Sequence, residues 1–170
     1  MGARPRAFRD VSFAKGDPTL LPMEAVILMG IPGSGKSTFF AGRLAYTHVR
    51  INLDSLHTRH RERVLLDACL GAGITFVVDN TNVTPAERAR YIAPARAAGF
   101  RVRGYFLQSR LDACLARNAQ RTGNARIPDA GVRGRHAELV IPTLEEGFDE
   151  LFFVELVGEE FRVTLWRTEA

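Results

Sequence analysis

Continuous apolar runs recur along the chain. The run AVILMG at residues 25–30 and the run ITFVVDN at residues 74–80 are typical of strands that are buried on both faces of a parallel sheet. HVRIN at 48–52 and RVRGYFLQ at 101–108 are two further strand candidates. These four segments predict the strands of one sheet.

Between these strands, apolar residues recur among polar ones at the spacing of a helix. Helices are predicted at 36–45, 55–73, 85–99 and 110–121. TPAE at 84–87 is a capping box, because Thr84 can accept from the third helical amide while Glu87 reaches back to the cap. TLEE at 143–146 is a second capping box. These signals fix where two helical segments begin.

The order of the elements predicts an α/β fold. Strands that alternate with helices favour a parallel sheet covered by helices on both faces. Residues 122–134 are rich in Gly, Asn, Arg and Pro and are predicted to be a loop that can act as a lid, and 151–158 with 161–166 predict a C-terminal hairpin. Residues 1–22 are expected to form a loosely held arm, and residues 23–170 one domain.

Composition narrows the class of protein. The longest apolar runs are far too short to span a membrane, and no signal peptide is recognisable, so a cytoplasmic protein without a membrane partner is expected. Cys69 and Cys114 have no metal or redox spacing and are interpreted as reduced helix residues, with a disulfide as the alternative. The net charge is +4, the pI is about 9.6, and Lys15 and Lys36 are the only lysines. Arginine suits phosphate oxygens, although genome composition also explains such an excess.

A phosphate-binding loop follows the first predicted strand. GIPGSGKS at 30–37 fits the Walker A pattern and lies between a buried strand and a helix, as that motif requires. Its backbone amides can hold phosphate oxygens, Lys36 can reach the β and γ phosphates, and Ser37 can offer its hydroxyl to Mg²⁺. The predicted nucleotide-binding residues within this segment are Gly30, Ile31, Pro32, Gly33, Ser34, Gly35, Lys36, Ser37 and Thr38.

Two carboxylates are predicted at the same edge of the sheet. Asp79 ends a buried strand, as a Walker B acid does, and is a candidate for contact with Mg²⁺ or Ser37; the alternative is an aspartate that begins a turn. Asp54 follows the second strand, so it also lies at a carboxyl end, where open α/β sheets bind ligands. Many of the residues near Asp54 in the sequence are basic: Arg50, His57, Arg59, His60, Arg61 and Arg63. Asp54 is therefore either a base beside a phosphate-bearing substrate or an acid that balances surface charge.

The motifs occur in the order seen in a known family. GIPGSGKST, INLDSL, VVDNTNVTPAERARY, RNAQR before IP, and IPTLEEGF resemble the polynucleotide 5′-hydroxyl kinases, including the kinase domains of the phage and mammalian enzymes, over residues 24–157. Gluconate kinases, chloramphenicol phosphotransferases and zeta toxins share parts of this pattern. The resemblance implies a P-loop kinase domain that uses ATP and Mg²⁺ and phosphorylates the 5′-hydroxyl end of DNA or RNA.

The resemblance also implies residue roles. Lys36 and Ser37 match the P-loop pair, Asp79 matches the acid of DNTN, and Asp54 matches the general base that takes the proton from the 5′-hydroxyl. Arg117 and Arg121 match the lid arginines that contact the donor phosphates. Their i, i+4 spacing places both on one helix face before the lid loop, although spacing alone favours two solvated arginines on a surface helix.

The acceptor side is less determined. At the position of His57 the phage enzyme carries an arginine that grips the acceptor phosphate, so His57 is either a phosphate contact or an ordinary surface residue. Arg88 and Arg90 follow DNTN and are candidates for contact with nucleic acid or for solvated charges.

Alternative functions remain open. A P-loop kinase of this architecture can also act on a small molecule such as a sugar, nucleoside or antibiotic, and a third possibility is a nucleotide-binding module with little activity. The 170 residues contain no DxDGT phosphatase stretch, in contrast to the phage and mammalian family members. In a repair pathway, separate proteins would then be expected to process the 3′ end and to ligate.

Overall fold

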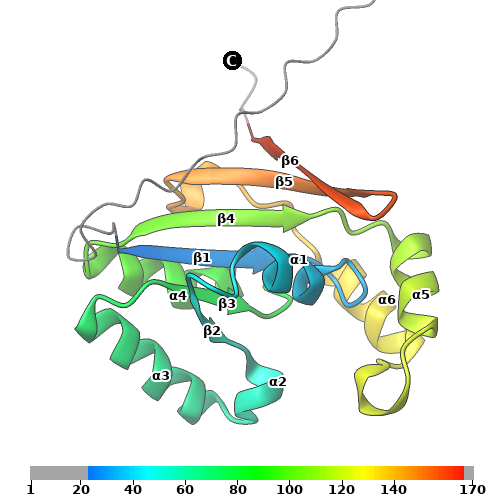
Figure 1. The fold of residues 1–170 in the computed structure, drawn as a ribbon, viewed down its shortest axis with the longest axis horizontal. Coiled ribbons are helices and arrows are strands. Elements are labelled where there is room, and N and C mark those ends of the chain that lie inside the picture. Colours follow the sequence, from blue (N-terminus) through cyan, green and yellow to red (C-terminus); the bar gives the residue numbers. More distant parts are fainter. Residues whose placement is uncertain (1–22, 167–170) are drawn as a thin grey trace, which may run out of the picture.

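The computed structural model describes residues 23–166, so the predicted N-terminal arm lies outside the described residues, as do residues 167–170. One six-stranded sheet organises this part of the chain, in the order β2-β3-β1-β4-β5-β6 (Figure 1). The strands are β1 (Glu24–Met29), β2 (Val49–Ile51), β3 (Phe76–Asp79), β4 (Arg101–Leu107), β5 (Glu150–Val157) and β6 (Glu160–Leu165).

All neighbouring strands are parallel except the last pair. β5 joins β4 in parallel, and β6 turns back antiparallel to β5, which confirms the predicted C-terminal hairpin. β1 lies between β3 and β4, so the loop that leaves β1 emerges near the middle of the sheet. The predicted α/β fold is confirmed.

Helices cover both faces of the sheet. They are α1 (Lys36–Arg43), α2 (Leu53–Leu56), α3 (Arg59–Ala72), α4 (Pro85–Ala97), α5 (Leu111–Ala119) and α6 (Asp129–Glu138), with short 3₁₀ turns η2 (Gly123–Ala125) and η3 (Leu144–Glu146). Both predicted capping boxes are present. The figure places α5 and α6 beyond the ends of the central strands (Figure 1).

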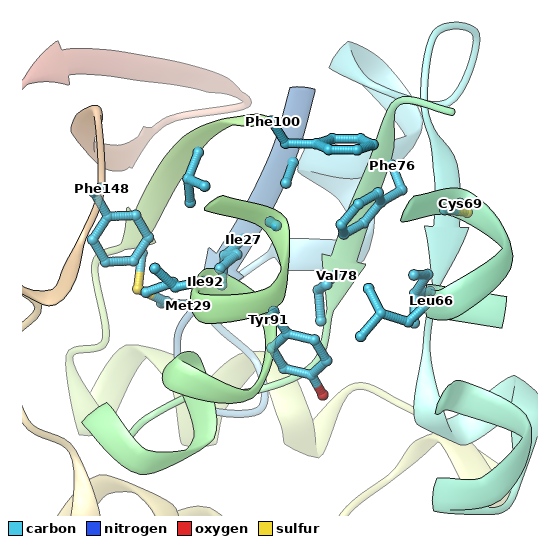
Figure 2. Packing of buried hydrophobic residues seen from close by; sticks show 14 of the residues in the cluster. Ile27, Met29, Leu66, Cys69, Phe76, Val78, Tyr91, Ile92, Phe100 and Phe148 are labelled. Carbon is cyan, nitrogen blue, oxygen red and sulfur yellow. The ribbon is translucent and has the colours of Figure 1, made fainter. Parts of the chain in front are cut away.

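The side chains of β1 explain this two-sided cover. Ile27 and Met29 belong to the cluster packed under α3 and α4, which Figure 2 displays with Tyr91 and Phe100. Alternate residues of the same strand point the other way, into a second cluster that contains Phe39 of α1. A continuous apolar strand is needed because both faces are buried.

The structure differs from the sequence predictions at the segments 55–73 and 122–134. The helix expected at 55–73 is broken, because His57 adopts a left-handed conformation (φ 67) and Thr58 caps a new helix by accepting from the Arg61 amide. The loop expected at 122–134 contains the start of α6, which begins at Asp129 after Pro128 and buries Val132. Burial of this valine and the hydrogen bonds of Arg135 to the loop after β3 stabilise a helix that its glycines disfavour.

Cys69 and Cys114 are free, buried cysteines on α3 and α5, in agreement with the expectation. Within residues 23–166, no helix has the length and apolar character needed to cross a membrane.

Candidate active site

The loop between β1 and α1 has the backbone shape of a phosphate cradle. Gly33 and Gly35 have φ values of 85° and 100°, which favour glycine, and a Cβ on Gly33 would collide with the Cys114 carbonyl oxygen. The loop ends at the N-terminus of α1, where free amides and the helix dipole attract anions.

Lys36 lies half-buried inside this loop. Its Nζ donates to the carbonyl oxygens of Gly30 (2.7 Å) and Ile31 (3.1 Å) and approaches Ser34 Oγ at 3.4 Å. Burial lowers the pKa of Lys36 to about 8, while the Asp79 carboxylate opposes this decrease. The ammonium is therefore still mainly charged at neutral pH, and it lies where phosphate oxygens on the loop would meet it.

One open pocket of about 830 Å³ gathers most of the predicted residues. Its size is within the range of small-molecule sites. The side chains of Lys36, Ser37, Asp54, His57, Asp79 and Arg121 all line it. Asn124, Ala125 and Ile127 cover one side, so the segment after α5 forms a wall of the pocket.

Asp54 is held at the rim by backbone contacts. It lies in the first turn of α2, where Asn52 caps the helix by accepting from the Ser55 amide at 3.1 Å. Asn52 Nδ2 also donates to the Asp79 carbonyl at 2.5 Å, which joins the turn after β2 to the end of β3. The carboxylate of Asp54 is exposed, so an acceptor molecule can reach it.

Asp79 has the opposite environment. Its side chain is 2% exposed and accepts from Arg50 at Oδ2, from Nε at 2.9 Å and from Nη2 at 2.5 Å. The same Nη2 donates to Ser37 Oγ at 3.2 Å. Sequence reasoning placed Arg50 only among the basic neighbours of Asp54, because its approach to Asp79 depends on the parallel pairing of β2 with β3.

The oxygens of Ser37 and Asp79 fit a hard cation. Both converge on one nitrogen of Arg50, and hydroxyl and carboxylate oxygens suit Mg²⁺. Among residues 23–166 no cluster of three His, Cys, Asp or Glu side chains could hold a metal alone. A magnesium ion bound here would therefore take its remaining ligands from phosphate and water.

Each residue of DNTN has a separate contact. After Asp79, Asn80 accepts from the Leu53 amide at 2.9 Å, and the Thr81 carbonyl accepts from the Gly30 amide at 2.9 Å. Asn82 adopts φ 47 and donates to the Leu28 carbonyl at 2.8 Å. This motif therefore ties β1, its loop and α2 together at one edge of the sheet.

A buried network behind Asn80 was not found from the sequence. Asn80 Nδ2 and Tyr91 Oη both donate to Glu62 Oε1, at 2.8 and 2.7 Å, and Arg59 donates to Oε2 at 2.7 Å. Burial tends to raise the pKa of Glu62, but the hydrogen bonds from Tyr91 and Arg59 outweigh it and lower the pKa. Burial and the contact with Glu62 raise the pKa of Tyr91 to about 12. This network fixes Asn80 and, through the Leu53 amide, the turn that carries Asp54.

The two predicted lid arginines do not share a helix face. α5 ends at Ala119, so Arg121 lies after the helix, where it lines the pocket. Arg117 is outside the residues that line the pocket and donates from Nε to the Gly33 carbonyl at 2.6 Å. The i, i+4 prediction is wrong because the helix is shorter than expected. Arg117 contacts the loop, whereas Arg121 faces the space beside it.

Arg88 is not available to nucleic acid, which corrects that prediction. Its side chain is 0% exposed and donates to both carboxylate oxygens of Glu146, at 2.6 and 2.8 Å. It also donates to the carbonyl oxygens of Asn82 and Val140. Arg88 therefore joins DNTN to the chain that follows α6.

The other acceptor candidates separate in space. His57 lines the pocket near Asp54. Arg90 is exposed but lines a different groove, between α3 and α4. Arg135 of α6, which sequence reasoning did not select, donates to Thr81 Oγ1 at 2.5 Å and to Glu87 at 2.8 Å. It ties α6 to the loop after β3.

Comparison with known proteins identifies the family to which the chain belongs. A family model described as an AAA domain matches residues 26–139. The chain belongs to this family. Together with its relatives, the match confirms the predicted P-loop kinase domain and its class, the phosphotransferases.

The relatives include a bifunctional polynucleotide phosphatase/kinase of Schizosaccharomyces pombe, which is 29% identical over 136 residues. The alignment covers 74% of this chain and 32% of that protein. A mimivirus relative is 27% identical, and this chain again spans 32% of its length. The chain thus corresponds to about a third of each curated relative.

A solved structure with the same fold is a gluconokinase from Sinorhizobium meliloti, with a TM-score of 0.56 and 20% identity, covering 78% of this chain and 82% of that one. This similarity concerns the fold.

Proposed function

We propose that this protein is an ATP- and Mg²⁺-dependent kinase that transfers the γ-phosphate to the 5′-hydroxyl end of a polynucleotide. The observation that carries the proposal is that exposed Asp54 lines the same pocket as Lys36, Ser37 and Arg121. A protein that only binds nucleotide has no need for a reachable carboxylate beside its phosphate cradle.

The geometry supports a direct transfer. Donor phosphates would rest on the amides of the loop and on Lys36, at the N-terminus of α1. Asp54 would accept the proton of the acceptor hydroxyl. The hydroxyl oxygen would then bond to the γ-phosphorus, while the bond from that phosphorus to the bridging β–γ oxygen breaks and ADP is released. Arg121 would stabilise charge on the transferred phosphoryl group. A bound Mg²⁺ would neutralise charge on the β and γ oxygens, and Ser37 and Asp79 would orient it.

The polynucleotide acceptor is supported by sequence relationship and charge. Two relatives named as polynucleotide phosphatase/kinases align over about three quarters of this chain. Arginines also follow His57 at the start of α3, at Arg59 and Arg61. A cationic surface that neutralises several phosphates releases counterions, so acceptor binding is expected to weaken steeply with salt. Separate proteins for 3′-end processing and ligation, and a cytoplasmic location, remain predictions from the sequence.

A small-molecule kinase is the second candidate, favoured by the fold shared with a gluconokinase. The test is a panel of acceptors incubated with γ-labelled ATP: 5′-hydroxyl DNA and RNA oligonucleotides, gluconate, nucleosides and an aminoglycoside. Label transfer to an oligonucleotide, abolished by Lys36→Ala to exclude a contaminating kinase, supports the proposal. Transfer to a small alcohol alone, together with acceptor affinity that does not change with salt, contradicts it.

A further inference from the structure

Arg50 joins the two side chains that would hold a metal. Its Nη2 donates both to Asp79 Oδ2 and to Ser37 Oγ, while its Nε donates to the same Asp79 oxygen. The guanidinium carbon lies 4.7 Å from the centre of the Phe40 ring, within the range of a cation–π contact. Arg50 is thus fixed from two sides at the mouth of the phosphate loop.

Ser37 Oγ and Asp79 Oδ2 therefore both face the positively charged guanidinium of Arg50. A divalent ion held by Ser37, directly, and by Asp79, directly or through water, would need the same lone pairs. Two cations placed this close repel each other, and the buried Asp79 cannot neutralise both. The guanidinium and the metal ion must then compete for these oxygens.

We propose that Arg50 is a resident cation of the metal site: it competes with the divalent ion for Ser37 and Asp79, and it takes over part of the ion's role when nucleotide binds without metal. The side chain of Arg50 is 35% exposed, so its Nη2 end has room to turn away. Phe40 and the bond from Nε to Asp79 would retain the rest of the group. Arg50 is a positioning residue in this account.

The proposal makes nucleotide binding less dependent on metal than it would be without Arg50. In the absence of a divalent ion, the guanidinium keeps its place beside Ser37, where it can meet the phosphates held by the loop and Lys36. A charge-assisted contact of this kind is worth about a tenfold change in affinity. In the presence of Mg²⁺ the same group is displaced and contributes little.

The test is calorimetric ATP binding, measured in EDTA and in saturating Mg²⁺, for the parent chain, Arg50→Gln and Arg63→Gln. Arg63→Gln is a matched control because it removes the same charge. The Arg63 side chain is 81% exposed and lies 3.9 Å from its partner Asp67. In Arg50→Gln, the Kd for metal-free ATP should rise about tenfold and the Kd in Mg²⁺ should stay equal or fall. The ratio of the Kd in EDTA to the Kd in Mg²⁺ should be the same in Arg63→Gln as in the parent.

A further variant keeps the result decisive. Arg50→Lys retains the charge but has no fork to reach both oxygens, so its ratio should lie about threefold above that of the parent. An equal loss of affinity in both conditions would make Arg50 a structural residue and overturn the proposal, and so would an unchanged ratio in Arg50→Gln. If Arg50→Gln does not fold, a parent-like ratio in Arg50→Lys overturns it.

This inference rests on the donor half of the proposed function only. No acceptor is present in the titrations, so failure to phosphorylate an oligonucleotide would leave the binding ratios unaffected. The two ideas can therefore fail separately.

Discussion

The candidate site has two regions with different chemistry: a rim that faces the pocket and a bracing layer behind it. Asp54 and Arg121 belong to the rim, where Asp54 is exposed and held mainly through the backbone around it. The bracing layer contains Asp79, which lines the pocket but is 2% exposed, and Arg117, which does not line the pocket. Their side chains bond to Arg50 and to the loop carbonyl of Gly33. The two aspartates thus differ in how accessible they are to a substrate, and so do the two arginines.

The position of the rim depends on contacts with the bracing layer. The turn that carries Asp54 is positioned by Asn80, which in turn bonds to buried Glu62. Rim variants should therefore change phosphoryl transfer with little effect on stability. Bracing variants should change stability first and transfer as a consequence.

The largest effect is expected for Asp54→Asn. Loss of a general base lowers the transfer rate by about 10²–10⁴, while ATP affinity and melting temperature should stay close to those of the parent, because the side chain is exposed and the loop is intact. Single-turnover transfer, calorimetry and thermal unfolding measure the three quantities. Lys36→Ala is the contrasting variant, in which ATP binding and transfer should be lost together. A transfer rate for Asp54→Asn within a few-fold of the parent would return Asp54 to the role of a surface acid.

The two arginines provide the next comparison. Arg121→Ala should slow transfer by about 10²–10³ with only a few-fold change in ATP affinity, because its charge acts on the transferring phosphoryl group. Arg117→Ala should instead lower the free energy of unfolding by about 1 kcal/mol and weaken ATP binding, because the Gly33 carbonyl loses its donor. The two variants remove the same charge and are each other's control. Identical kinetic defects would remove the distinction between rim and bracing layer.

Asp79→Asn is expected to act mainly on stability and metal dependence. The carboxylate is buried while Arg50 is one-third exposed, so the pair is screened in part and its loss should cost about 1–3 kcal/mol of unfolding free energy. Chemical denaturation measures this difference, and Asp54→Asn, which carries the same charge change, serves as the control. Equal stability of the two variants would show that burial does not separate the two aspartates.

The smallest effect concerns acid pH. The pKa of Glu62 is below its usual value of 4.5 in the folded protein, so its contribution to stability is present above pH 4.5 and is lost as the pH falls through the folded pKa. Glu62→Gln should lose about 1–2 kcal/mol at neutral pH and should lack this part of the acid dependence. Denaturation curves at a series of pH values compare the two proteins. Parallel pH profiles for parent and variant would contradict a depressed pKa for Glu62.

Much of the fold and the donor site could be predicted because they depend on local signals. The buried runs, the P-loop spacing and the capping boxes are short-range patterns, and the structure contains each of them. The break at His57 and the start of α6 escaped prediction. A single left-handed residue decides the break, and the buried Val132 together with the long-range contacts of Arg135 supports the helix.

The bracing contacts could not be predicted for a different reason. The pairs Arg50–Asp79 and Arg88–Glu146 join residues far apart in the sequence, and charge composition alone treats every arginine as a candidate for the surface. Only the strand order and the path after α6 reveal which arginines are internal. This explains why the sequence left Arg88 as a candidate for nucleic acid or for a solvated charge, and placed Arg50 only in the neighbourhood of Asp54.

The central claim is that the residues of the rim transfer the γ-phosphate of a bound ATP to a polynucleotide 5′-hydroxyl. The most direct measurement uses γ-labelled ATP, Mg²⁺ and two oligonucleotides of identical sequence, one with a free 5′-hydroxyl and one whose 5′ end is blocked by a methyl ether. The account predicts that label is transferred to the free 5′ end only, and that Asp54→Asn reduces this transfer by about 10²–10⁴. Label on the blocked oligonucleotide, or none on either, would contradict it.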